Sequence, residues 1–96
     1  MENKHWLILY DIKNEKRLVK VAKLLESYAV RVQKSVFEIT APNSIIFCLK
    51  NKIEKVIELE YDFVLFFEIC EKDWQKQQLY GINKNFETED TKFKIL

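Results

Sequence analysis

Hydrophobic positions divide the first part of the chain into strand-like and helix-like segments. Residues 6–10 form an unbroken apolar run ended by Asp11, which predicts a strand covered on both faces. Over residues 14–28 the apolar positions recur at spacings of three and four, which predicts an amphipathic helix with Asn14 as its cap. Residues 30–39 predict a second strand, in which a change of apolar phase near Lys34 indicates a bulge or a strong twist.

The second half of the chain repeats the alternation of helix and strand. A turn at residues 40–43, which contains the single proline, leads to a predicted helix at 44–59 and a third strand at 61–70. The remaining tail is polar and charged, with short possible strands at 79–82 and 93–96. No internal repeat, low-complexity stretch or linker divides the chain, so residues 1–96 are expected to form one domain.

This order of elements predicts an α+β fold, a ferredoxin-like βαββαβ sandwich. Two helices cover one face of such a sheet, yet the first strand and residues 63–67 are apolar on both sides. The second face therefore needs another cover, and a second copy of the chain is the simplest one. The pattern predicts a homodimer.

The composition limits the number of domains, the kind of binding partner and the location of the protein. A chain of 96 residues that is 48% hydrophobic and 32% charged should fold as one unit. Its formal net charge is +1, so binding to a polyanion would depend on where the cations lie. The N-terminal apolar run is too short for a signal peptide or a membrane span, which predicts a cytoplasmic protein without a membrane partner. Cys48 and Cys70 are isolated and are expected to be reduced core residues.

The first predicted helix carries a basic stripe opposite its apolar one. Such a stripe is often only a solvated helix face. However, Lys16 and Arg17 fall in the first helical turn, where cations oppose the helix dipole, and phosphate oxygens would compensate for that cost. The stripe is therefore a candidate nucleic-acid surface. Its residues are Lys13, Lys16, Arg17, Lys20 and Lys23.

Asp11 is the candidate metal ligand, because it ends the first strand just before the helix. The alternative is an ordinary turn or capping aspartate. Magnesium is usually held by one or two carboxylates together with waters and phosphate oxygens. A two-fold axis that brought two Asp11 side chains together would supply what one chain lacks, so the dimer and the metal site support each other.

The segment 31–38 mixes phosphate-binding groups, among them Lys34, with core residues on a strand. Together with the preceding segments it resembles the CRISPR-associated Cas-two (Cas2) family, the small partner of the integrase that captures new CRISPR spacers. The resemblance is carried by Tyr10-Asp11, Lys16-Arg17-Leu18, Lys20-Val21-Ala22-Lys23, Leu25, Tyr28, Arg31-Val32-Gln33 and Ser35-Val36-Phe37-Glu38.

The resemblance implies a ferredoxin-like homodimer that binds Mg²⁺ or another divalent cation at Asp11. It also implies phosphate-backbone contacts at Arg17, Arg31, Gln33 and Ser35, and a C-terminal strand within residues 79–96 that packs on the partner subunit at the dimer interface. Two departures stand out. Ala29 occupies the place of a usual glycine, and residues 63–67 lack the arginine that the family often has there.

Several functions remain open. The dimer could bridge CRISPR integrase subunits on double-stranded DNA or RNA without catalysis, or it could be a metal-dependent endonuclease with Asp11 as its catalytic residue. A toxin ribonuclease of the VapD sort and a non-catalytic, ferredoxin-like regulatory module are the alternatives. The one histidine, His5, is expected to be a half-exposed strand residue rather than a general base.

Overall fold

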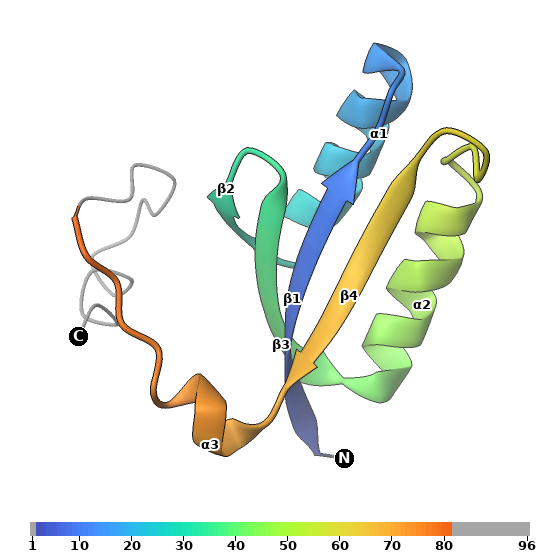
Figure 1. Ribbon diagram of the computed structural model, residues 1–96. Coiled ribbons are helices and arrows are strands. Elements are labelled where there is room, and N and C mark those ends of the chain that lie inside the picture. Colours follow the sequence, from blue (N-terminus) through green and yellow to red (C-terminus); the bar gives the residue numbers. More distant parts are fainter. Residues whose placement is uncertain (1, 82–96) are drawn as a thin grey trace.

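The chain folds into a four-stranded antiparallel sheet with two helices on one face (Figure 1). This computed structural model describes residues 2–81. The strand order is β2-β3-β1-β4, so the predicted α+β, ferredoxin-like βαββαβ arrangement is confirmed. The elements are β1 (Asn3–Asp11), α1 (Glu15–Glu26), β2 (Val30–Gln33), β3 (Val36–Pro42), α2 (Asn43–Glu54), β4 (Phe63–Ile69) and α3 (Glu71–Trp74).

The prediction of one strand over residues 30–39 is wrong. This stretch is a hairpin, in which β2 and β3 pair antiparallel and the chain reverses at Lys34 and Ser35. The apolar phase changes there because the chain turns back, while the irregularity in the pairing lies earlier, between Arg31 and Gln33.

The predicted turn at residues 40–43 is also wrong. Strand β3 continues through this stretch to Pro42, which is itself the N-cap of α2. Proline is tolerated here because Pro42 is the last residue of the strand, and its fixed φ, −71° in this structure, suits the residue before a helix. Helix α2 ends at Glu54, five residues before the predicted end, and a loop leads from it to β4.

The core lies between the helices and one face of the sheet. Helix α1 turns its predicted apolar stripe inward, with Val21 and Leu25 fully buried, and Asn14 caps it by accepting a hydrogen bond from the Arg17 N–H. Alternate residues of the central strands point at the helices, as the two-residue period of a strand requires. The buried apolar residues are Ile8, Tyr10, Ile12, Val21, Leu25, Phe37, Ile39, Ala41, Ile46, Leu49 and Ile53.

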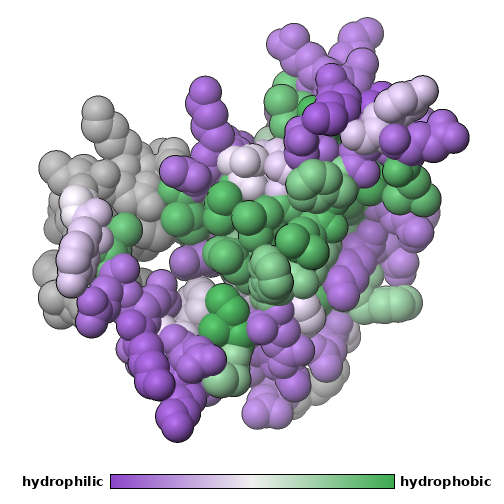
Figure 2. All heavy atoms as spheres, in the orientation of Figure 1, coloured by the Kyte–Doolittle hydropathy of each residue, from purple (hydrophilic) through white to green (hydrophobic). Residues whose placement is uncertain are grey.

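The other face of the sheet keeps large apolar side chains exposed. Phe63, Leu65 and Phe67 of β4 are 54%, 43% and 51% exposed, and the last two lie opposite Leu9 and Leu7 of β1. We call these five residues the open face. Figure 2 shows hydrophobic side chains gathered over this side of the sheet. Within residues 2–81 both long helices lie on the opposite face, as the sequence predicts.

Helix α3 docks at one end of the open face through His5. The imidazole stacks on Trp74 with ring centroids 4.5 Å apart, and its two nitrogens contact Thr40 Oγ1 and Glu71 Oε1. Beyond α3, residues 79–81 form no strand, and the rest of the predicted tail strands lies outside the described residues.

Cys48 and Cys70 are free and exposed, so their predicted place in the core is wrong. Cys48 lies on the outer side of α2, and Cys70 follows β4.

Among the helices of residues 2–81, none is long and apolar enough to cross a membrane.

Candidate nucleic-acid and metal site

The topology gathers the predicted site residues at one end of the sheet. Strands β1 and β2 are each antiparallel to β3, so they run parallel and their carboxyl ends lie at the same end of the sheet, on either side of β3 (Figure 1). Asp11 ends β1, Lys16 and Arg17 lie in the first turn of α1, and Lys34 and Ser35 form the hairpin turn. Residues that are distant in sequence therefore share one surface.

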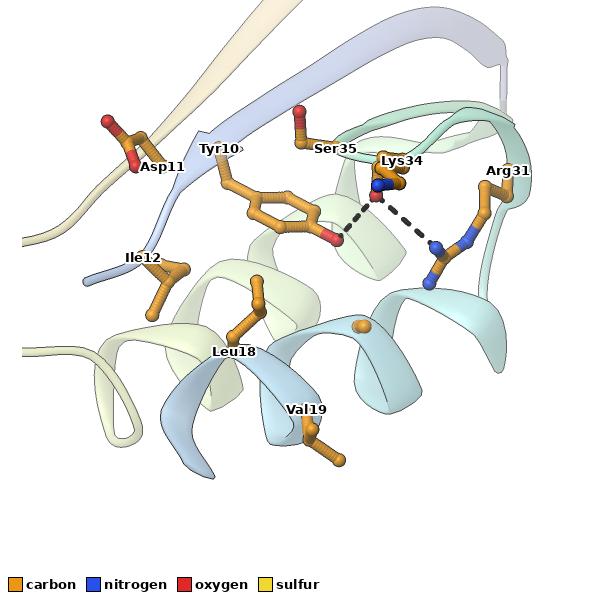
Figure 3. A pocket seen from close by; sticks show the side chains of 9 residues that line it. Tyr10, Asp11, Ile12, Leu18, Val19, Arg31, Lys34 and Ser35 are labelled. Atoms are coloured by element: carbon orange, nitrogen blue, oxygen red, sulfur yellow. Dashed lines mark hydrogen bonds between the residues drawn. The ribbon is translucent and has the colours of Figure 1, made fainter. Parts of the chain in front are cut away.

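An open pocket of about 760 Å³ lies at this end of the sheet (Figure 3). Half of the predicted site residues line it, namely Asp11, Arg31, Lys34 and Ser35. Asp11 and Arg31 lie at its opposite ends, with Tyr10 between them. The other lining residues are Ile12, Leu18, Val19 and Ala22.

Arg31 is held in place at its end of the pocket. Its Nη2 donates to Glu26 Oε2 at 2.9 Å, its Nη1 donates to the Lys34 carbonyl at 3.3 Å, and its guanidinium lies 5.0 Å from the Phe37 ring centroid. The Tyr10 hydroxyl donates to the same Lys34 carbonyl at 3.0 Å, and burial raises the pKa of that hydroxyl. These bonds fix the hairpin turn against β1.

Asp11 projects from the same side of β1 as Leu7 and Leu9, because alternate residues of a strand share a face. It therefore stands at the end of the open face, with its side chain 49% exposed. Lys13 Nζ donates to Asp11 Oδ2 at 3.0 Å.

Oxygen ligands of this kind suit a hard cation such as Mg²⁺. In the described part of the chain no three His, Cys, Asp or Glu residues cluster, so these residues form no three-ligand metal site within one chain. The site with two Asp11 carboxylates that the sequence predicts would need a second chain.

Asp62 is the functional neighbour that the sequence analysis missed. Its fully buried carboxylate accepts hydrogen bonds from Arg17 Nε at 2.7 Å and Arg17 Nη2 at 3.1 Å, and from the backbone N–H groups of Lys13 and Glu58, each at 2.9 Å. The Arg17 guanidinium holds the pKa of Asp62 well below its usual range, the two backbone N–H groups add to this, and burial opposes it.

Arg17 therefore already has an anionic partner within the fold. The hydrogen bond to Asp62 also raises the pKa of Arg17. The cost of a cation in the first turn of α1, which the sequence analysis assigned to phosphate, is compensated by this carboxylate. A phosphate contact by Arg17 stays a prediction, with Nε and Nη2 engaged by Asp62.

The remaining predicted contacts lie on the surface. Lys16, Lys20 and Lys23 are exposed along α1, and Gln33 is exposed beside the hairpin turn. Because these side chains are free to reach outward, they are better placed for a large polyanion than Arg17 is.

The family model for the CRISPR associated protein Cas2 matches residues 4–77. The chain belongs to the Cas2 family. A curated relative from a Synechocystis species, named CRISPR-associated endoribonuclease Cas2 3, is 34% identical over 76 residues, which cover 79% of this chain and 83% of the relative. Another of the same name, from Thermodesulfovibrio yellowstonii, is 36% identical over 78 residues, or 81% of this chain and 88% of that one.

Solved structures agree with this membership. The crystal structure of Streptococcus pyogenes Cas2 superposes with a TM-score of 0.68 at 32% identity, covering 80% of this chain and 99% of that one. A chain in a partial Cas6-RT-Cas1-Cas2 complex superposes with a TM-score of 0.68 at 28% identity, covering 80% and 90%. The resemblance predicted from the sequence is confirmed, and Cas2 is favoured over the VapD alternative.

Proposed function

We propose that this Cas2 protein acts as a symmetric homodimer that binds double-stranded nucleic acid by its phosphates, bridges CRISPR integrase subunits during spacer acquisition and hydrolyses phosphodiesters with Mg²⁺ at Asp11. The observation that carries the proposal is the place of Asp11 on the open face. A second chain packed there by a two-fold axis near Asp11 brings two carboxylates to one surface.

The open face supports the dimer by its size and chemistry. It carries Leu7, Leu9, Phe63, Leu65 and Phe67 on two adjacent strands, and the three from β4 are about half exposed. Full burial of one such side chain is worth about 1.5–3 kcal/mol, so a partner chain on this face would gain several such contributions. The proposed single domain of residues 1–96 would add the tail after residue 79 to this interface.

Backbone binding is supported by the cations at the same end of the molecule. Lys16 and Lys20 are exposed on α1, and Lys34 and Ser35 lie at the hairpin turn with Gln33 next to them. Lysines on a helix contact phosphates without reading bases, so we expect affinity that depends on salt and little on sequence.

The metal chemistry would rest on Asp11. A cation bound there would lower the pKa of a water molecule and stabilise the charge that develops on the phosphate. Asp11 would supply the ligand, and Arg31 and the lysines would hold the phosphate groups nearby. That two relatives are named endoribonucleases supports phosphodiester hydrolysis, and the Cas1-Cas2 complex supports an integrase partner.

The second candidate is a bridge without catalysis. It is favoured by the ion pair of Asp11 with Lys13 at 3.0 Å, because a carboxylate that pairs with a lysine needs no metal ion to balance its charge. Both candidates need the dimer and the basic end of the sheet, but they differ in their need for Asp11.

The variant Asp11→Ala tests the proposal. We expect it to abolish Mg²⁺-dependent cleavage of duplex substrates while duplex affinity, measured by fluorescence anisotropy, stays within about twofold, because lysines supply most of the binding. Cleavage that survives in this variant would refute the role of Asp11. Integration of spacers by the partner integrase, retained in the same variant, would favour the bridge.

A further inference from the structure

In the described part of the molecule the single buried charged side chain belongs to Asp62, and this residue contacts the segments next to Asp11. Asp62 immediately precedes Phe63, the residue that pairs with Asp11 across β1 and β4. It also binds the backbone N–H of Lys13, two residues after Asp11. One carboxylate thus fixes both the cross-strand neighbour of Asp11 and the chain that follows it.

The hydrogen bonds show why this residue must be a carboxylate. Oδ1 accepts from the Lys13 N–H and Arg17 Nη2, and Oδ2 accepts from Arg17 Nε and the Glu58 N–H. Every partner is a donor. An amide in place of the carboxylate would turn an NH₂ group toward two N–H donors in either orientation, so asparagine cannot substitute without moving one of the three segments.

Lys13 connects this buried group to the surface. Its backbone N–H is held by Asp62, while its side-chain Nζ donates to Asp11 Oδ2. The backbone position of Lys13, and therefore the direction of its side chain toward Asp11, depends on the hydrogen bond to Asp62. Arg17, which lies on α1, donates to both oxygens of the same carboxylate and so ties Asp62 to that helix.

We infer that Asp62 and Arg17 are a positioning pair for Asp11: they hold the end of β1 so that the Asp11 carboxylate points outward from the open face, ready to bind a divalent cation. The inference rests on the proposed function for the ligand, but its geometry concerns this chain alone. It assigns Arg17 to the interior of the fold and leaves the phosphate contacts to Arg31 and the exposed lysines. Neither residue touches the cation or the reacting phosphate.

The test compares Asp62→Asn and Arg17→Lys with Ile46→Val, a control in the first turn of α2 beside the start of β1. The affinity for Mn²⁺ alone is measured from the free-ion signal in electron paramagnetic resonance. Loss of a residue that orients a metal ligand typically weakens metal affinity about 10- to 100-fold, and we expect such a loss in Asp62→Asn and a smaller one in Arg17→Lys. Ile46→Val should bind Mn²⁺ as the wild type does. Equal effects in all three variants, or none in the first two, would overturn the inference.

A second measurement separates this inference from the proposed function. In ¹H–¹⁵N spectra without metal, the Asp11 amide should broaden or shift in Arg17→Lys and Asp62→Asn and stay unchanged in Ile46→Val. If the wild type binds no Mn²⁺, the metal part of the proposed function fails. The Asp11 amide signal still shows whether Asp62 and Arg17 position Asp11. If Asp62→Asn does not fold, both the Mn²⁺ affinity and the Asp11 amide signal are measured in Arg17→Lys. An Asp11 amide signal identical to that of the wild type in Arg17→Lys would then contradict the positioning role of Arg17 and Asp62.

Discussion

Arg17 has the residue type and the position of a phosphate-binding group, yet the fold engages it with Asp62. The sequence could predict Asp11, because a carboxylate that ends a buried strand stands out from the pattern. It could not predict Asp62, which precedes β4 without any local signal and whose partners Arg17 and Lys13 lie 45 and 49 positions earlier in the chain. Such a pair exists only through the tertiary structure.

The buried carboxylate should make stability depend on acidity. The pKa of Asp62 is depressed in the fold, mainly by the hydrogen bond from Arg17, whereas an unfolded chain has a value of about 3.9. The stabilisation is therefore complete above about pH 5 and is lost as the pH falls toward the lower folded value. Urea unfolding of the wild type and of Asp62→Asn should give free energies whose difference shrinks from about pH 5 to about pH 2. A difference that stays constant over this interval would contradict the account.

At the scale of elements, periodicity predicted the two long helices and the strands β1 and β4, because burial of one face leaves a regular pattern. The hairpin could not be predicted, since its turn at Lys34 and Ser35 contains no glycine, proline or asparagine. Side-chain hydrogen bonds stabilise that turn instead, because the Lys34 carbonyl accepts from Tyr10, which is 24 positions away in the sequence, and from the nearby Arg31.

The cap of α1 is a local determinant that can be tested by itself. The Asn14 Oδ1 accepts the Arg17 N–H at 3.0 Å. Asn14→Ala should lower the free energy of unfolding in urea by about 1 kcal/mol, because a free helix N–H loses its acceptor. Asn14→Asp keeps an acceptor and should unfold close to the wild type. Equal losses in both variants would mean that the cap does not stabilise α1.

The exposed lysines of α1 should set the salt dependence of duplex binding. In the double variant Lys16→Ala with Lys20→Ala, the slope of log affinity against log salt concentration should flatten. The change should be roughly 0.9 for each phosphate that the two lysines neutralise in the wild type, and it should be the same for every duplex sequence. Lys72→Ala with Lys76→Ala removes the same charge near α3, at the far end of the sheet from Asp11, and serves as the control. An unchanged slope in the α1 variant would remove these lysines from the interface.

At the scale of the whole molecule, the sequence predicted the uncovered sheet face, because β1 and β4 are apolar on both sides and two helices can cover one. How a second chain would lie on that face, and how near it would bring the two Asp11 groups, depends on shape and not on pattern. Helix α3 adds a boundary to this face that no periodicity indicated, since it docks on His5 through the stack with Trp74 and the contact with Glu71.

The central claim is that a second chain covers the open face. Leu65→Asp places a charge in the middle of that face without touching the core, because Leu65 is 43% exposed in the single chain. A carboxylate buried without a partner is strongly unfavourable, so this variant should dissociate the dimer while its circular dichroism stays that of the wild type.

Sedimentation equilibrium measures this directly. The wild type should have twice the chain mass of 11.6 kDa, and Leu65→Asp should have the mass of one chain. A wild type that sediments as a single chain at every concentration would contradict the account.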